Sequence, residues 1–309
     1  MAEWAKRRRY TAAQFSAQRL RSQKGPATVA VVIPTKECAA SIAGVLRQAV
    51  APVADRALVD EVVVIDARSE DGTADVAAAE GARVLQQDEI LVDHGPALGK
   101  GDALWRAVHA TSSEIVCFLD GDTVDPVPTH LLGLIAPLIS DSSLQLVKGA
   151  YDRPLRTGGA ELAGEGGRVT ELMARPLLNM YEPPLAGFAQ PLAGEFAARR
   201  SFLEQIPFPV GYGVEIAVLI DALHLYGLDA LSECHLGTRR QPHQPLRVLG
   251  EMSYAVLAAV QRRVGELGDR ISGRYVRPWD EFSVALVPIA ERPPLAALGD
   301  AASGVSAEL

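Results

Sequence analysis

The chain is poor in cysteine and contains no long uninterrupted apolar run. Its 309 residues include three cysteines, Cys38, Cys117 and Cys234, which lie far apart and without C-x-x-C spacing. This argues against both a disulfide framework and a structural zinc site. No apolar run approaches the roughly 18–20 residues of a membrane-spanning helix, and none follows the basic start of the chain as it would in a signal peptide. We therefore expect a protein of the reducing cytoplasm, without a membrane partner.

Positive charge and aromatic residues are also scarce. Lysine and arginine number 30 against 38 aspartates and glutamates, a net charge of −8, and aromatic residues make up 6%. Such a chain has no overall field for nucleic acid, so we expect no nucleic-acid partner and look for anion sites in local pockets. With 48% hydrophobic residues and this length, disorder is excluded, and one large α/β domain, or one and a half, is expected.

Apolar runs at 28–33, 61–65 and 114–119 are typical of strands that are covered on both faces. Helical patterns at 41–50, 73–80 and 99–110 separate them, and a short strand is expected near 82–85. This alternation predicts a doubly wound parallel sheet, whose ligands bind outside the carboxyl ends of the strands. Pro34, Asp66 and Asp120 directly follow the three apolar runs, so we expect them to border one crevice.

The second half of the chain begins with another apolar strand and then changes character. The expected elements are a strand at 144–150, a helix at 169–180, a helix at 213–226, a strand near 228–236 and an amphipathic helix at 246–264. The predicted division is a basic N-terminal extension at 1–27, a nucleotide-binding half at 28–150, an acceptor-binding half with C-terminal helices at 151–295, and a flexible tail at 296–309.

The sharpest local signal is Asp120-Gly121-Asp122, placed directly after a predicted strand. Two carboxylates at a strand end can face one hard cation, which can neutralise a diphosphate. A solvated acidic turn is the alternative, and the neighbouring strand and helix favour a function.

Two glycine-rich helix starts suggest anion sites. Lys100 is flanked by glycines and opens a helix, an arrangement suited to phosphate although it is not a P-loop motif. Gly166-Gly167-Arg168 enters a second helix, with Arg175 further along it, and can bind a small anion that bears carboxylate and phosphate. A capped surface helix and an ordinary glycine-rich loop are the respective alternatives.

A proline-punctuated loop at 236–245 carries two arginines and His243. The imidazole can ligate a metal or contact phosphate, although a loop histidine is more often simply solvated.

Taken together, these segments resemble one protein family. The motifs are PTKE at 34–37, VVVIDARSEDGT at 62–73, GKGDALWRA at 99–107, DGD at 120–122, GGRVTELMARPLL at 166–178, QPLAGEFA at 190–197 and GYGVEIAVLID at 211–221. The chain resembles the actinobacterial-type glucosyl-3-phosphoglycerate synthases, retaining glycosyltransferases of GT-A fold, whose family also includes mannosyl-3-phosphoglycerate synthases. The resemblance covers approximately residues 28–260, and GGRVTELMARPLL is its most specific part.

The resemblance implies a GT-A, Rossmann-like sheet that binds a nucleotide sugar, followed by an acceptor-binding region. The implied donor is UDP-glucose, with GDP-mannose as the alternative, the implied acceptor is D-3-phosphoglycerate, and the implied cofactor is Mg²⁺ or Mn²⁺. The product would be a precursor of glucosylglycerate-type compatible solutes or of polysaccharides. A homodimer is also implied, with the helix at 246–264 either an interface or part of the core.

The same resemblance implies roles for individual residues. The donor-binding residues it implies are Pro34, Glu37, Asp66, Arg68, Ser69, Lys100, Asp120, Gly121, Leu192 and Arg239. The acceptor-binding residues are Gly167, Arg168, Val169 and Thr170. Asp122 and Glu215 are the implied catalytic residues, and Asp122 and His243 the implied metal ligands.

Two motifs depart from the family pattern. The usual first motif resembles P-x-x-N-E, whereas here the acidic residue is Glu37 and Cys38 takes the usual glutamate position. The late loop resembles L-G-x-R-x-H-x-N, but Gln241 replaces the expected metal-ligating histidine and His243 follows two residues later. The choice between uridine and guanosine donors therefore stays open, as does the path by which the loop reaches the metal.

Other functions fit parts of the sequence. A sugar-1-phosphate nucleotidyltransferase would normally carry a glycine-rich G-x-G-T-R-like turn where this chain has Pro34-Thr-Lys-Glu37. A non-catalytic nucleotide-binding regulator would leave the Gly-Arg turn without an acceptor. A transferase with a membrane acceptor could use the basic segment at 6–9, which we interpret instead as a solvated helix or an oligomer contact.

Overall fold

A mixed sheet of eight strands forms the centre of the molecule. The computed structural model describes residues 2–157, 160–162, 166–239, 244–265, 271–277, 279–280 and 283–298. In spatial order the strands are β1 (Arg9–Thr11), β11 (Leu231–Thr238), β6 (Leu146–Asp152), β9 (Phe196–Arg199), β5 (Ile115–Phe118), β2 (Val29–Thr35), β3 (Glu61–Asp66) and β4 (Arg83–Gln86). All neighbours pair in parallel except β9, which runs antiparallel to both β5 and β6. The predicted α/β sheet is therefore confirmed, but it is not wholly parallel.

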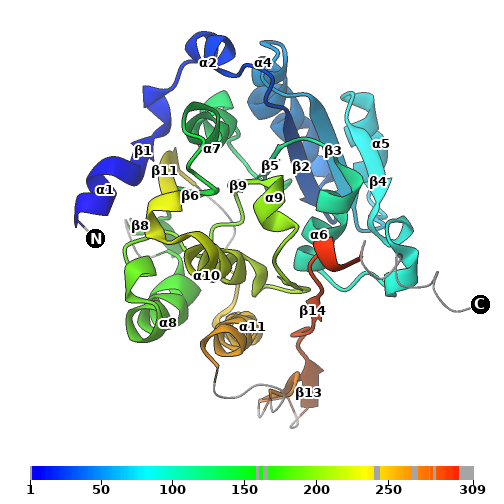
Figure 1. Cartoon of the computed structure of the whole chain (residues 1–309). Helices are drawn as coiled ribbons and strands as arrows, with labels where there is room; N and C mark the ends of the chain where they lie inside the picture. The colour runs from blue at the N-terminus through cyan, green and yellow to red at the C-terminus, as the bar shows by residue number, and fades with distance from the viewer. Residues whose placement is uncertain are drawn as a thin grey trace, which may run out of the picture.

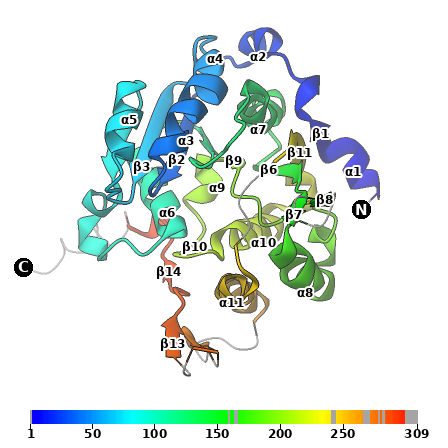
Figure 2. The same cartoon turned by 180° about the vertical axis from the view of Figure 1, so that it is seen from behind.

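Helices cover both faces of this sheet (Figures 1 and 2). One face carries α3 (Ala39–Gly44), a π-helical turn η2 (Val45–Val50), α4 (Ala51–Ala54), α5 (Thr73–Ala79) and α7 (Pro128–Ser140). The other face carries α6 (Lys100–Ala110), α10 (Val214–Tyr226) and, beyond it, α11 (Leu246–Val264). Each face buries its own apolar cluster, with strand residues such as Val31 on one side and Val32 on the other, as expected for strands covered on both faces.

Shorter elements complete the described part of the chain. They are α1 (Ala2–Arg8), η1 (Ala12–Gln14), α2 (Ala17–Gln23), η3 (Gln87–Glu89), η4 (Val92–His94), β7 (Leu155–Thr157), β8 (Ala160–Leu162), η5 (Thr170–Ala174), α8 (Arg175–Tyr181), η6 (Pro183–Leu185), α9 (Arg200–Leu203), β10 (Phe208–Pro209), η7 (Leu228–Ala230), β12 (Arg274–Arg277), β13 (Ser283–Leu286) and β14 (Glu291–Arg292). The β12–β13 hairpin lies beyond α11, at the end of the molecule opposite α2 and α4 (Figure 1).

Residues 2–11 pack against the sheet and add a strand to its edge, which the sequence patterns did not predict. A helix is present as expected, but the Trp4 side chain is 3% exposed, and its indole N–H is 3.1 Å from the carbonyl oxygen of Leu231. Residues 9–11 then form the edge strand β1 against β11. The segment is too polar and too short for a strand signal, so its pairing is decided by tertiary contacts.

The apolar face of the helix predicted at 246–264 is part of the core. The helix has those bounds, and Ala255, Val256 and Val260 on it are at most 4% exposed. The three cysteines are buried free thiols, as the absence of a disulfide framework predicts. Within the described ranges, none of the helices has both the length and the apolar character needed to cross a membrane.

Candidate active site

The carboxyl ends of β2, β5 and β6 open into a cavity of about 1190 Å³. The start of α6 and the turn at 167–170 also line it. Thirteen of the sequence-predicted site residues lie on its wall: Pro34, Glu37, Arg68, Lys100, Asp120, Gly121, Asp122, Gly167, Arg168, Val169, Thr170, Leu192 and Glu215. Segments more than 100 residues apart in the chain therefore meet where a doubly wound sheet binds its ligand.

Lys100 forms the cationic centre of this wall. Its ammonium lies 2.9 Å from a carboxylate oxygen of Asp120 and 3.1 Å from one of Glu215. Burial alone would lower the pKa of Lys100, but these two carboxylates raise it above its ordinary value. The group is therefore a permanent cation at the start of α6, a position that already favours anions.

Arg239 forms ion pairs with the carboxylates at and beside the end of β5. Its guanidinium lies 2.8 Å from Glu195, 3.1 Å from Asp120 and 3.6 Å from Asp122. Burial would raise the pKa of Asp120, but Lys100 and Arg239 hold it below its ordinary value. Asp120 is thus an anion fixed between two cations, whereas the Asp122 side chain is 62% exposed.

Two glycines let the backbone approach these charged groups closely. A Cβ atom on Gly194 would lie 2.3 Å from the Lys100 ammonium and 2.8 Å from an Asp120 carboxylate oxygen. A Cβ atom on Gly121 would lie 2.8 Å from the Thr35 side chain. Both spacings are too short for real carbon contacts, so a larger residue at either position would displace the Lys100, Asp120 or Thr35 side chain.

The Gly-Arg turn forms the opposite side of the cavity. Gly166 donates its N–H to the carbonyl oxygen of Arg153 at 2.9 Å, and Gly167 adopts a φ of 74° that favours glycine. The Arg168 guanidinium donates to the carbonyl oxygen of Gln244 at 2.6 Å. The turn is thereby tied to the end of β6 and to the segment that precedes α11.

Asp66 and Ser69 lie behind the cavity wall rather than on it. The expectation that Asp66 borders the crevice is wrong, because its side chain is fully buried. Its carboxylate accepts from the Ser69 hydroxyl at 2.6 Å and from Thr35 at 3.1 Å, and the Ser69 hydroxyl in turn accepts the Glu37 N–H. These bonds join the loop after β2, which carries Glu37, to the loop after β3, which carries Arg68. The φ angles of Glu37 and Arg68, 52° and 54°, are unusual for residues other than glycine.

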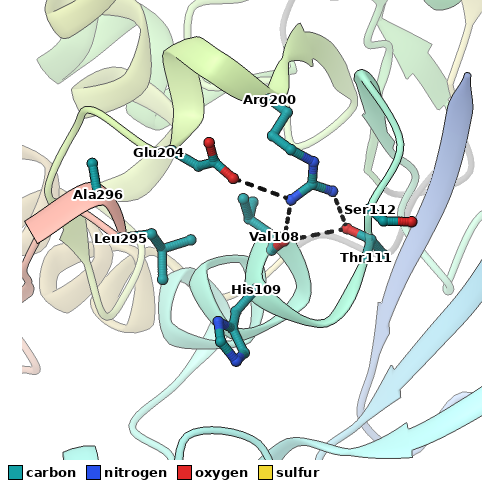
Figure 3. Close-up of a pocket in the computed structure, with 8 residues that line it drawn as sticks. All are labelled: Val108, His109, Thr111, Ser112, Arg200, Glu204, Leu295 and Ala296. Atoms are coloured by element: carbon teal, nitrogen blue, oxygen red, sulfur yellow. Dashed lines mark hydrogen bonds and ion pairs between the residues drawn. The ribbon is translucent and has the colours of Figure 1, made fainter. Parts of the chain in front are cut away.

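The helix that presents Lys100 is held at both ends. Near its start, Asp102 accepts from Arg106 at 3.0 Å and from Arg292 at 2.8 Å. At its end, Arg200 donates to the Val108 carbonyl oxygen and the Thr111 hydroxyl, beside a smaller cavity of about 430 Å³ (Figure 3). The second cavity is therefore built around the cap of α6.

Two buried charged residues of this region, Glu195 and Lys148, were assigned no role by sequence reasoning, and the half-buried Arg175 has other partners than expected. Glu195 pairs with Arg239, and burial raises its pKa; it lies in the quoted QPLAGEFA motif, which was the available signal. Lys148 is fully buried on β6, where its strand pattern gave no sign of function. Arg175, expected near the acceptor turn, instead donates to the carbonyl oxygens of Phe188 and Ala189.

Of the predicted metal ligands, Asp122 belongs to the described part of the chain. His243 and Gln241 lie outside the described residues. Asp122 reaches the cavity, but the described part of the chain holds no cluster of three or more histidine, cysteine, aspartate or glutamate side chains suited to a metal ion. The described residues therefore fit an ion whose remaining ligands come from a bound diphosphate or from the late loop.

The sequence of the chain is similar to those of known enzymes. The sequence model of glycosyl transferase family 2 matches residues 30–163. A glucosyl-3-phosphoglycerate synthase of Mycolicibacterium smegmatis is 40% identical over 283 residues, which cover 90% of this chain and 92% of that protein. One of Mycobacterium tuberculosis is 44% identical over 250 residues, covering 80% of this chain and 76% of that protein.

Solved structures of two related enzymes superpose on the chain along most of its length. The crystal structure of mannosyl-3-phosphoglycerate synthase from Rubrobacter xylanophilus superposes with a TM-score of 0.87 at 39% identity, covering 96% of this chain and 99% of that chain. The Mycobacterium tuberculosis glucosyl-3-phosphoglycerate synthase, in complex with Mn²⁺, UDP-glucose and phosphoglyceric acid, superposes with a TM-score of 0.82 at 39% identity, covering 92% and 95%.

Proposed function

The chain belongs to the glucosyl-3-phosphoglycerate synthase family, and from that premise we propose that it transfers glucose from UDP-glucose to the 2-hydroxyl of D-3-phosphoglycerate. The observation that carries this proposal is the shared cavity. The charged strand end with Lys100 and the Gly-Arg turn with Arg168 line the same 1190 Å³ space. Two anion-binding segments on one cavity suit a reaction between a nucleotide diphosphate and a phosphorylated acid.

The donor diphosphate would bind at the start of α6. Lys100 supplies a fixed positive charge there, and its pairing with Asp120 and Glu215 holds the ammonium in one position. Leu192 and Gly194 on the neighbouring wall leave room for the sugar beside it. Glu215, 6% exposed, lies close enough to this corner to accept hydrogen bonds from sugar hydroxyls.

The acceptor would bind at the Gly-Arg turn. An acid with about three negative charges near neutral pH needs donors that are already in place. Arg168 offers a fork of N–H groups, and the amides of residues 167–170 add main-chain donors at the start of a helix. The contact from Arg168 to the Gln244 carbonyl would be exchanged for a stronger one with a carboxylate or phosphate.

We expect attack from the same face as the departing diphosphate, as the family resemblance implies. The acceptor hydroxyl oxygen bonds to the anomeric carbon, the bond from that carbon to the diphosphate breaks, and the leaving phosphate oxygen takes the hydroxyl proton. Lys100 and Arg239 stay charged throughout, because the pKa values of both are raised above their ordinary ones. They stabilise the negative charge that develops on the leaving group.

Mn²⁺ or Mg²⁺ fits this site as the cofactor. Asp122 is the described carboxylate that would hold it, since both Asp120 oxygens already accept from cations. When bound, such an ion neutralises charge on the leaving diphosphate. Because the chain supplies few ligands in its described part, we expect the ion to bind much more tightly in the presence of UDP than alone.

Release of UDP from UDP-glucose, measured with and without 3-phosphoglycerate, tests the proposal. The expected result is release that requires both the acceptor and Mn²⁺, with one equivalent of glucosylated product for each UDP. Release that is independent of the acceptor, or absent with every donor, would contradict it.

A mannosyl-3-phosphoglycerate synthase is the second candidate, since the superposition on the Rubrobacter xylanophilus enzyme has the higher TM-score. The same assay with GDP-mannose separates the two. A higher kcat/KM for GDP-mannose than for UDP-glucose would transfer the assignment to this activity.

We also propose that the chain works in the cytoplasm as a homodimer. Three buried free thiols suit a reducing compartment. On the β12–β13 hairpin, Val276, Val284 and Leu286 are 54%, 40% and 79% exposed, an outward apolar face that a second copy of the chain can cover.

A further inference from the structure

A row of charged and aromatic side chains crosses five strands behind the cavity. Arg9, Glu233, Lys148, Phe196 and Phe118 are successive register partners on β1, β11, β6, β9 and β5. Register partners lie on one face of a sheet with their side chains in reach of each other. Arg9 pairs with Glu233 at 3.1 Å, and the Lys148 ammonium lies 5.1 Å from the centre of the Phe196 ring.

This row supports the loop at 187–194, which ends on the donor side of the cavity. Arg9 donates to the carbonyl oxygen of Gly187, and Glu233 accepts the Ala189 N–H at 2.6 Å. Lys148 donates to the carbonyl oxygen of Ala193 at 2.6 Å. The basic N-terminus thus contributes one end of a support that reaches the site through the loop.

The loop position matters because Gly194 touches the charged centre. A Cβ atom on this residue would lie 2.3 Å from the Lys100 ammonium and 2.8 Å from Asp120, so the backbone of the loop runs directly beside both groups. Lys148, whose N–H holds the adjacent residue Ala193, is 0% exposed. A displaced Ala193 would therefore change the space in which Lys100 and Asp120 meet the donor.

Keeping an ammonium at this depth is costly. Burial lowers the pKa of Lys148 to about 8, although the carboxylate of Glu215 opposes that shift. Among the described residues, no carboxylate forms an ion pair with Lys148. Asp120 and Glu233 add weaker attraction to that of Glu215, while Lys100 repels the ammonium. An apolar residue of similar length would remove this cost together with the bond to the Ala193 carbonyl, so stability alone gives little reason for a lysine here.

We propose that Lys148 is a positioning residue for the donor sugar, acting through the Ala193 carbonyl and the loop at 187–194. This rests on the proposed glucosyl transfer. The lysine need not touch the donor; it fixes the backbone of Leu192–Gly194, which lines the donor wall. The role differs from a packing role in one respect: removing the ammonium damages donor use without lowering stability.

The test compares Lys148→Met with Arg199→Met. Arg199 is the control for a purely structural cation. It donates to the main-chain carbonyls of Leu144, Leu138 and Asp141 and pairs with Glu114, at the opposite end of β9. For Lys148→Met we expect kcat/KM for UDP-glucose to fall at least about tenfold, because a small displacement of a binding wall costs rate, with the KM for 3-phosphoglycerate within about twofold. The Tm should change little, because the desolvation cost of the ammonium and its bond to the buried Ala193 carbonyl are removed together. Arg199→Met should lower the Tm and leave both KM values unchanged.

Two results would overturn the proposal. The first is a kcat/KM of Lys148→Met for UDP-glucose within about twofold of the wild type. The second is a fall in Tm together with a rise in both KM values, which would indicate a structural role. Lys148→Gln, which keeps an N–H donor, should recover part of the donor loss; no recovery would reject the carbonyl as the point of action. Calorimetric binding of UDP-glucose to the same variants keeps the test separate from the proposed function, since it reads donor positioning even if the wild type proves inactive toward 3-phosphoglycerate.

Discussion

At the scale of single residues, the site depends on charges that are fixed before any ligand arrives. Asp120 lies between Lys100 and Arg239, and Arg239 also pairs with Glu195. The sequence could predict Asp120 and Lys100, because each stands at a recognisable strand end or helix start. It could not predict that Glu195 and Lys148 lie behind them, because burial of a charged residue depends on which strands become neighbours.

Gly194→Ala should disrupt the charged centre without unfolding the chain. The added methyl group would lie 2.3 Å from the Lys100 ammonium, and that ammonium must leave Asp120 or Glu215 to make room. We expect kcat/KM for UDP-glucose to fall at least about tenfold, the loss of one charge-assisted contact. Gly44→Ala is the control, since its nearest atom, on Pro126, is 3.9 Å away; it should keep full activity. An active Gly194→Ala enzyme would show that the close approach is not needed.

Arg168→Met should weaken acceptor binding selectively. Losing a guanidinium that binds carboxylate or phosphate costs about 1.5–3 kcal/mol, so we expect the KM for 3-phosphoglycerate to rise roughly 10- to 100-fold while that for UDP-glucose stays within about twofold. Arg168→Lys, which keeps the charge but not the planar fork, should give an intermediate value. Steady-state kinetics with each substrate varied check this, and an unchanged acceptor KM would remove Arg168 from the acceptor site.

At the scale of elements, sequence periodicity located the parallel strands other than β1 and most of the longer helices, although it gave no bounds for α7. The helix at 246–264 has the predicted bounds, because a long amphipathic stretch defines its own ends. β9 and β1 were missed. Both are short, at four and three residues, and their pairing is decided by neighbours that are remote in the chain. The antiparallel β9 directly follows the loop at 187–194 and holds its end at the cavity. The missed strand therefore helps to position the proposed donor wall.

The contact between α7 and β11 should make stability depend on pH. His130 on α7 is 8% exposed, and burial, with Arg239 nearby, lowers its pKa to about 4. Between about pH 6.5 and 4, His130 is therefore protonated in the unfolded chain but stays neutral in the folded chain. The free energy of unfolding falls as the pH drops through this window. His130→Gln should remove a pH-dependent contribution of up to about 3 kcal/mol. Urea unfolding of both proteins at pH 7 and pH 4.5 measures it; a constant difference between them would contradict the assignment.

At the scale of the whole molecule, the two segments that we propose to bind anions come from different parts of the chain and line one cavity. Sequence motifs identified both segments, because the acidic turn at 120–122 and the glycine-rich turn at 166–168 each have a recognisable pattern. Their meeting follows from the sheet order, which places β6 near β5 with only β9 between them. The sequence left open whether the amphipathic helix at 246–264 is an interface or part of the core, and its apolar face packs into the core.

The outward face of the β12–β13 hairpin should hold two copies together. A two-stranded sheet is marginally stable alone, and apolar residues on its open face gain from a partner. The double variant Val276→Asp and Leu286→Asp should convert a particle of twice 32.9 kDa to one of 32.9 kDa, measured by light scattering. Val92→Asp, at an equally exposed valine (60%) away from the hairpin, is the control. A double variant that stays dimeric would place the interface elsewhere.

The most direct measurement is a crystal structure with UDP, Mn²⁺ and 3-phosphoglycerate bound together. We predict the diphosphate beside Lys100 and Asp122, and the acid against Arg168 and Thr170, with its 2-hydroxyl oriented toward the diphosphate across a gap that one hexose fills. Binding of the acid outside this cavity, or a gap too long for one hexose to bridge, would contradict the account.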